Sequence, residues 1–280
     1  SAFSISADVY APLFRDAMRF YFLQRCGMTL DAAHAGAWAR APCHQADAKA
    51  VERDGSGEPR DVRGGWHDAG DTNKYPPFVR DPLCMMLDLY DARPAAFPDG
   101  QLGIAESGNG IPDLLDEAAW ELDWLLTMQI ARGPAAGAVD DQITERVMPP
   151  FAGPPFQNVR RLLPPNLDAA AVCASVWARA VRTFETLPGL KTRAGRYRAA
   201  AELSWRRLVA DKAKPAQLLT AALPLYQLTG GTEYLTAATR ALDAELGTKT
   251  GDAAAEKFMW AKWDVAVAEF AASPEPVRRV

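Results

Sequence analysis

The sequence has no long apolar run, no basic patch and only four cysteines. Its 280 residues carry 31 lysines and arginines against 35 aspartates and glutamates, a net charge of −4. No apolar run approaches the roughly 18 residues that a membrane span needs. Basic residues do not cluster as they do in nucleic-acid-binding proteins, and four cysteines are too few for a disulfide scaffold. We therefore expect a soluble globular protein with no membrane and no nucleic-acid partner.

Strand-like alternation is also lacking, whereas helical periodicity recurs along the chain. The clearest helix is predicted over 111–130, where Pro112 falls in the first turn and leucines recur on one side. Residues 29–63 lack periodicity and 137–165 are rich in proline, so both are predicted to be long loops. The pattern predicts an all-α array of helical hairpins. Its other expected helices cover residues 8–26, 79–90, 167–185, 192–209, 216–229, 233–246 and 253–272.

One glycine-flanked loop carries the residues best suited to chemistry. It reads Gly-Gly-Trp-His-Asp-Ala-Gly-Asp over residues 64–71 and places Asp68 and Asp71 three positions apart. Glycine permits tight turns, so the loop can present both carboxylates together. Two carboxylates this close also repel, which raises the pKa of one of them. Turn capping or calcium binding by these acids is the alternative interpretation.

Three motifs, taken in order, resemble glycoside hydrolase family 9, whose members are mainly cellulases. The first is the loop at 64–71, which continues to Lys74 and Tyr75. The second is the acid- and glycine-rich segment at 97–117, and the third is the helix that follows it, through Gln129. The Gln-Arg-Cys-Gly and Pro-Cys-His steps near the N-terminus resemble a subgroup in which an immunoglobulin-like module precedes the catalytic domain. The resemblance implies an (α/α)6 toroid and inverting hydrolysis of β-1,4-glucan.

By this resemblance Asp71 is the general base and Asp68 helps to position the attacking water. An inverting glycosidase sets its acid and base about 6.5 to 9.5 Å apart to leave room for that water. The family's acid is a glutamate in the C-terminal third of the domain, in a motif that is not found here. The last glutamates of the chain, to none of which we assign this role, are Glu256, Glu269 and Glu275.

The missing acid motif bears on the domain as a whole. We expect residues 1–280 to form a single catalytic domain that corresponds to roughly the N-terminal two-thirds of the family domain, with an incomplete toroid. Very low activity is expected if the chain is complete. The chain begins at Ser1 and not at Met, so a removed leader and a secreted or periplasmic location are expected.

Two thiols and two imidazoles form the donor set of a tetrahedral zinc site. They belong to Cys26, Cys43, His44 and His67, which match positions where the family subgroup binds structural zinc. Such a site would fix His67 and stiffen the adjoining loop without entering the reaction. A disulfide between the two cysteines, with histidines that only pack, is the alternative. Calcium is a further candidate cofactor, at the acids of residues 106–117.

Aromatic residues near the loop are candidates for binding sugar rings. Trp66 and Tyr75 lie in the motif itself and are predicted to bind substrate. Trp120 and Trp124 lie four apart on the strongest amphipathic helix, so core packing is expected for them.

The sequence therefore predicts hydrolysis of β-1,4-glucosidic bonds in cellulose, β-glucan or cello-oligosaccharides. One alternative is an exo-β-glucosaminidase of the same family, which chito-oligosaccharides would distinguish from a cellulase. A glycan-binding domain without catalysis is a second alternative, and a zinc-stabilised structural domain without glycan affinity is a third.

Overall fold

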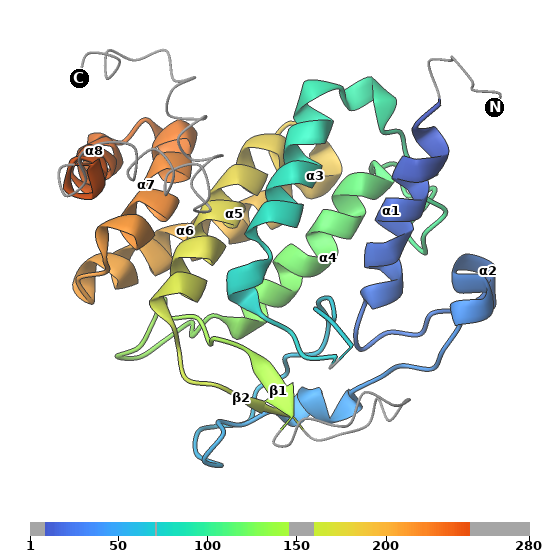
Figure 1. The fold of residues 1–280 in the computed structure, drawn as a ribbon, viewed down its shortest axis with the longest axis horizontal. Coiled ribbons are helices and arrows are strands. Elements are labelled where there is room, and N and C mark those ends of the chain that lie inside the picture. The colour runs from blue at the N-terminus through green and yellow to red at the C-terminus, as the bar shows by residue number, and fades with distance from the viewer. Residues whose placement is uncertain (1–8, 71, 146–159, 247–280) are drawn as a thin grey trace.

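Helices dominate the computed structural model, which describes residues 9–70, 72–145 and 160–246 (Figure 1). This confirms the all-α class; the helix expected at 253–272 lies outside the described residues. The helices are α1 (Ala11–Gln24), α2 (Ala32–Ala35), α3 (Arg80–Ala92), α4 (Asp113–Met128), α5 (Leu167–Phe184), α6 (Lys191–Ala210), α7 (Pro215–Thr229) and α8 (Thr232–Leu246).

Helices α3 to α8, hereafter the helical array, pack side by side as hairpins. Helix α5 contacts α3, α6 and α7, and α7 contacts α8. The composition of α5 explains its central position, because it is rich in alanine and 14 of its 18 residues are buried. Small side chains let neighbouring helices approach it from several sides.

Capping residues set the ends of these helices. The Asn166 side chain accepts a hydrogen bond from the backbone N–H of Asp168 (2.6 Å) at the start of α5. Pro215 begins α7, and Gly230 ends it at a φ of +68°. The predicted helix boundaries are accordingly close to those observed.

A two-stranded antiparallel sheet corrects the prediction that 137–165 is a loop without strands. It consists of β1 (Ile143–Glu145) and β2 (Arg160–Leu162). Isolated bridges extend it to Lys74 on one side and to Glu52 on the other. Three-residue strands are too short to show alternation, and their partners lie far away in the sequence. Sequence periodicity therefore could not reveal them.

Residues 25–75, with β1 and β2, form a second region that we call the loop platform. In Figure 1 it lies below α1 and α4. The expected irregular segment at 29–63 contains only α2 and two 3-10 turns, Gly36–Trp38 and Gln45–Lys49. The largest fully buried side chains of the loop platform include Arg25, Lys74 and Arg160. Charged groups therefore make up much of the interior of this platform.

No helix within residues 9–70, 72–145 and 160–246 combines the length and apolar character that crossing a bilayer requires.

Candidate functional site

The glycine-rich loop is paired with the end of α1. Cys26 donates its backbone N–H to the carbonyl of Gly65 (2.8 Å), and His67 donates to the carbonyl of Gln24 (2.9 Å). Gly65 has a φ of +71°, and a Cβ at this position would lie 2.4 Å from the Trp124 ring. Only glycine fits both the backbone conformation and the space.

The two tryptophans of α4 support this loop from the array side. Trp124 is fully buried, as predicted, and its indole N–H donates to the carbonyl of Val62 (3.1 Å). Trp120 is half-buried and donates to the carbonyl of Gly65 (3.1 Å). Both rings therefore belong to the junction between helix and loop.

Two buried carboxylates of α4 fix Trp66. Glu117 accepts from the indole N–H of Trp66 (2.8 Å), and Glu121 accepts from its backbone N–H (2.7 Å). Arg25 forms an ion pair with Glu117 at 3.1 Å. Burial raises the pKa of Glu121 to about 8. Glu117 was predicted from the sequence only as a calcium candidate and Glu121 was not singled out, although two glutamates four apart on an apolar helix are a usable signal.

Trp66 is only 7% exposed, so its ring offers little surface to a ligand. Of the two aromatic residues predicted to bind substrate, Tyr75 is the better placed. Its ring stacks on Phe78, with centroids 5.2 Å apart and an angle of 26° between the planes. Phe78 is 54% exposed. The aromatic pair Tyr75–Phe78 thus presents a flat apolar surface of the kind that sugar rings pack on.

Asp68 lies on the exposed side of a tight turn. Its backbone N–H donates to the carbonyl of Asn73 (2.9 Å), and Thr72 donates to the carbonyl of Ala69 (3.0 Å). Thr72 has a φ of +58°, which is unusual for a β-branched residue and costs about 1–3 kcal/mol. Asp71 lies outside the described residues, so its role stays a prediction.

A cavity of about 200 Å³ connects the turn to the aromatic pair. Asp68 and Tyr75 line it, together with His67 and the buried Glu121. The structure thus brings the predicted catalytic residue Asp68 to the same cavity as both predicted substrate-binding residues, because Trp66 also lines it.

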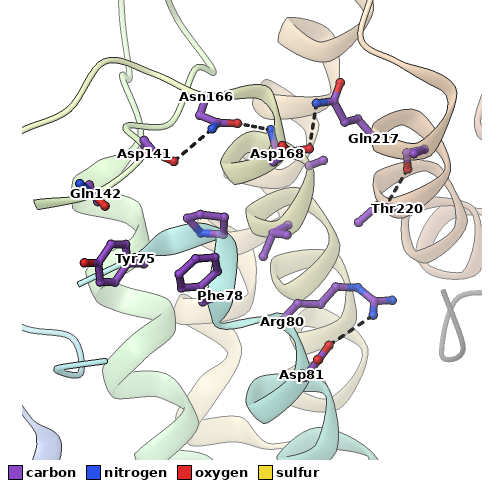
Figure 2. A pocket seen from close by; sticks show the side chains of 14 residues that line it. Tyr75, Phe78, Arg80, Asp81, Asp141, Gln142, Asn166, Asp168, Gln217 and Thr220 are labelled. Carbon is purple, nitrogen blue, oxygen red and sulfur yellow. Dashed lines mark hydrogen bonds and ion pairs between the residues drawn. The ribbon is translucent and has the colours of Figure 1, made fainter. Parts of the chain in front are cut away.

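A larger pocket of about 450 Å³ continues on the other side of the aromatic pair (Figure 2). Its polar side chains were missed by the sequence analysis. Asn166 donates to Asp141 (3.1 Å), and Gln217 donates to Asp168 (2.9 Å), so they form a rim from the loop before β1 to α7. Amides and carboxylates facing stacked aromatic rings suit the hydroxyls and ring faces of sugars.

The four predicted zinc ligands converge in the loop platform. All four are buried, and one donor atom from each lies within 4.8 Å of the other three. The Sγ atoms of Cys26 and Cys43 are 3.7 Å apart. Cys26 Sγ lies 3.6 Å from His44 Nδ1, and Cys43 Sγ lies 3.7 Å from His67 Nε2.

These distances fit a tetrahedral zinc ion. Bonds of about 2.3 Å to sulfur and about 2.0–2.1 Å to nitrogen imply S···S edges of about 3.8 Å and S···N edges of about 3.5 Å. Both cysteines are free thiols, so the alternative disulfide is not formed in this structure. We call the four residues the Cys/His cluster.

Protonation in the cluster also favours a metal. A hydrogen bond with the Cys26 thiol, and a further one from the Gly27 amide, lower the pKa of Cys43 to about 6 although burial opposes the shift. Burial lowers the pKa of His67. A thiolate and a neutral imidazole are the forms that bind zinc.

A buried charge network surrounds the cluster, and the sequence analysis missed most of it. Arg160 binds both oxygens of Asp47 and donates to Cys26 Sγ (3.3 Å). Lys74 Nζ lies 3.4 Å from Asp47 and donates to the carbonyl of Gly64 (2.6 Å). Arg160 comes from a proline-rich segment without periodicity, so no sequence signal could have placed it here.

The acids predicted as a calcium site have protein partners instead. The carboxylate of Asp113 accepts from the Leu102 amide (2.7 Å) and from the Ser107 hydroxyl (2.7 Å). Asp116 accepts from the Asn109 side chain (3.0 Å). In the described part of the chain, only the Cys/His cluster brings three or more such ligands close enough to hold a metal. Calcium therefore gains no support.

With this geometry in view, comparison with known proteins is decisive. The family model for glycosyl hydrolase family 9 matches residues 10–274. The chain belongs to glycosyl hydrolase family 9. Endoglucanase D of Acetivibrio thermocellus is 34% identical over 184 residues, which is 65% of this chain and 29% of that protein. A xyloglucan-specific endo-β-1,4-glucanase of Bacteroides ovatus is 32% identical over 204 residues, or 69% of this chain and 34% of that protein.

Solved family 9 structures share the fold. A Zn-binding triple mutant of family 9 endoglucanase J30 has a TM-score of 0.77 and 28% identity, over 90% of this chain and 51% of that one. A metagenome-derived family 9 endoglucanase has a TM-score of 0.75 and 32% identity, over 84% of this chain and 46% of that one. The predicted family fold is thereby confirmed.

Each of these matches covers most of this chain but a much smaller share of the relative. The chain spans about a third of the curated relatives and about half of the solved structures. The immunoglobulin-like module and the extent of the domain stay predictions.

Proposed function

We propose that this chain contributes the water-activating side of a family 9 active site that hydrolyses β-1,4-glucosidic bonds in cellulose or related glucans, with inversion. One observation carries the proposal: within the family match, Asp68 opens on a cavity that it shares with the aromatic pair. Relatives named as endoglucanases support the substrate class.

In the proposed mechanism, Asp71 accepts a proton from water while Asp68 orients that water. The resulting hydroxyl adds to the anomeric carbon from the face opposite the leaving group. The bond to the glycosidic oxygen then breaks, and that oxygen receives a proton from a general acid. We assign the acid to none of the described residues; Glu256, Glu269 and Glu275 lie outside them.

The glycan would follow the two pockets that meet at the aromatic pair. Tyr75 borders both, so a sugar ring on its face could reach Asp68 on one side and the polar rim on the other. Stacking on the aromatic pair would fix the plane of the ring, and the amides of Asn166 and Gln217 would bind its hydroxyls.

Zinc has a structural place in this proposal. Cys26, Cys43, His44 and His67 would hold the ion, which when bound supplies a fixed tetrahedral crosslink and no reaction step. Because His67 precedes Asp68, the crosslink would limit movement of the catalytic turn.

Reducing-sugar release from carboxymethylcellulose tests the function. Asp71→Asn and Asp68→Asn should each lower turnover at least about 100-fold, since general-base and water-positioning groups contribute factors of this order. Asp61→Asn is the matched control, because Asp61 is exposed in the same platform and pairs with the exposed Arg63. Turnover that survives Asp71→Asn, or a product first released as the β-anomer in NMR, would contradict the mechanism.

One observation favours the amino-sugar alternative. The carboxylates of Asp141 and Asp168 line the larger pocket and could attract an ammonium group. Turnover of chito-oligosaccharides above that of cello-oligosaccharides would select this alternative. If the chain binds cellohexaose but releases no sugar product, it is a glycan-binding domain without catalysis. If it does not bind cellohexaose at all, the interpretation as a zinc-stabilised structural domain remains. A location outside the cytoplasm stays a prediction.

A further inference from the structure

We propose that Arg160 is a positioning residue that transmits the order of the Cys/His cluster to the turn carrying Asp68 and Asp71. The inference rests on the proposed role of this turn. Its basis is a set of contacts that one guanidinium makes at once to the cluster and to the turn.

Arg160 is fully buried, and each edge of its guanidinium has a different acceptor. Nε and Nη2 bind the two oxygens of Asp47, and Nη2 also donates to Cys26 Sγ (3.3 Å). Nη1 donates to the backbone carbonyl of Thr72 (2.5 Å). The planar fork of arginine can satisfy three acceptors in fixed directions, which lysine cannot do.

Thr72 is the residue whose conformation most needs external support. It directly follows Asp71 in the chain, and its φ of +58° is rarely adopted by β-branched residues. Its amide closes the turn onto Ala69, while its hydroxyl lies 3.4 Å from His44 Nε2. The Thr72 carbonyl and hydroxyl therefore both face groups of the cluster or its immediate surroundings.

Arg160 itself has little freedom to move. It lies on β2 opposite Glu145 of β1, and Asp47 is shared with Lys74 at 3.4 Å. The positive charges of Arg160 and Lys74 are met by the Asp47 carboxylate and, when a metal is held by the cluster, would also be met by the Cys26 sulfur as a thiolate. Such a satisfied buried network has one preferred geometry. Fixing the cluster would thus fix the carbonyl of Thr72.

Hydrogen exchange with mass spectrometry on the zinc-loaded chain tests this inference. In Arg160→Met the amides of residues 68–74 should exchange about tenfold faster, the effect expected from losing one charge-assisted hydrogen bond. Arg161→Met is the matched control, since the Arg161 guanidinium contacts only the Arg160 carbonyl among the described partners (3.4 Å). Exchange in α5 and α7 should not change.

Arg160→Lys separates positioning from folding. Lysine keeps the buried charge and should keep the zinc and the thermal midpoint, yet exchange at 68–74 should still be several-fold faster. Wild-type exchange at 68–74 in both variants would overturn the inference. So would loss of zinc from both, because Arg160 would then act only in metal retention. Hydrolysis is not read in this experiment, so an inactive chain with the expected exchange pattern would count against the proposed function alone.

Discussion

The helical array and the loop platform are stabilised by different kinds of interaction. The array buries side chains such as Trp177, Phe184 and Leu225, whose contribution scales with area and requires little directionality. The platform buries Arg25 and Arg160, whose contribution depends on the position of each partner. Family 9 chemistry would be performed on the platform, where a directional network fixes the turn more closely than apolar packing could.

Among the changes that separate the two regions, removal of the metal should disturb the platform most. Cys43→Ser should abolish zinc binding and lower hydrolysis or cellohexaose affinity at least about tenfold, because the platform loses its crosslink. Most of the helical circular dichroism should persist, since the array does not depend on the cluster. Cys84→Ala, which changes a buried thiol of α3, is the control and should keep full zinc content. Parallel loss of helix and zinc would show that the two regions are not separable.

A core truncation in the array should have the opposite pattern. Leu225→Ala on α7 removes a fully buried side chain and should lower the free energy of unfolding by about 2–5 kcal/mol. Zinc stoichiometry of the folded protein should not change. Leu13→Ala, at a site that is 66% exposed, should change stability by less than about 0.5 kcal/mol in the same urea titration.

The junction between the two regions depends on a glycine. Gly65→Ala would place a Cβ within 2.4 Å of the Trp124 ring at a positive φ, and should cost about 3 kcal/mol. Gly133→Ala is the control, because Gly133 has a φ of +81° but an added Cβ would meet no atom beyond its chain neighbours within 4 Å. The Gly133→Ala variant should lose only about 1 kcal/mol of unfolding free energy, which is the cost of the backbone strain alone. Equal losses in the two variants would remove the argument for close packing.

The last prediction concerns pH. Burial raises the pKa of Glu121 to about 8, so between its ordinary value of 4.5 and pH 8 the folded protein binds a proton that the unfolded chain releases. This contribution to stability is complete below the ordinary value and is lost as pH rises towards 8. The Glu121→Gln variant keeps a side-chain oxygen that can accept from the Trp66 backbone N–H. Because glutamine does not titrate, this variant should not lose stability as the pH rises towards 8.

Urea unfolding of both proteins measures this difference. Relative to wild type, Glu121→Gln should gain up to about 3–4 kcal/mol between about pH 5 and about pH 8. A stability difference that is the same at both pH values would mean that Glu121 does not titrate in this range.

The array could be predicted from the sequence, whereas much of the platform could not. Helix α4 could be predicted from its repeating leucines and from the acids at its start, because helices are local structures with a fixed period. The contact between Arg160 and Cys26 joins residues 134 positions apart, and no local pattern encodes it. Strands β1 and β2 escaped detection for the same reason.

The candidate site shows the same division. The four cluster residues were predicted from donor chemistry and family resemblance, and the structure brings them together. Residues that support the site, such as Glu121 and Asp47, were missed because a buried charge in sequence looks like any surface charge. Only its partners reveal its position.

X-ray absorption at the zinc edge of the purified protein tests the central claim most directly. The account predicts one zinc ion with two sulfur neighbours at about 2.3 Å and two nitrogen neighbours at about 2.0 Å. A folded protein without zinc, or a zinc shell made mainly of oxygen, would contradict the claim that a Cys/His cluster holds the catalytic turn in place.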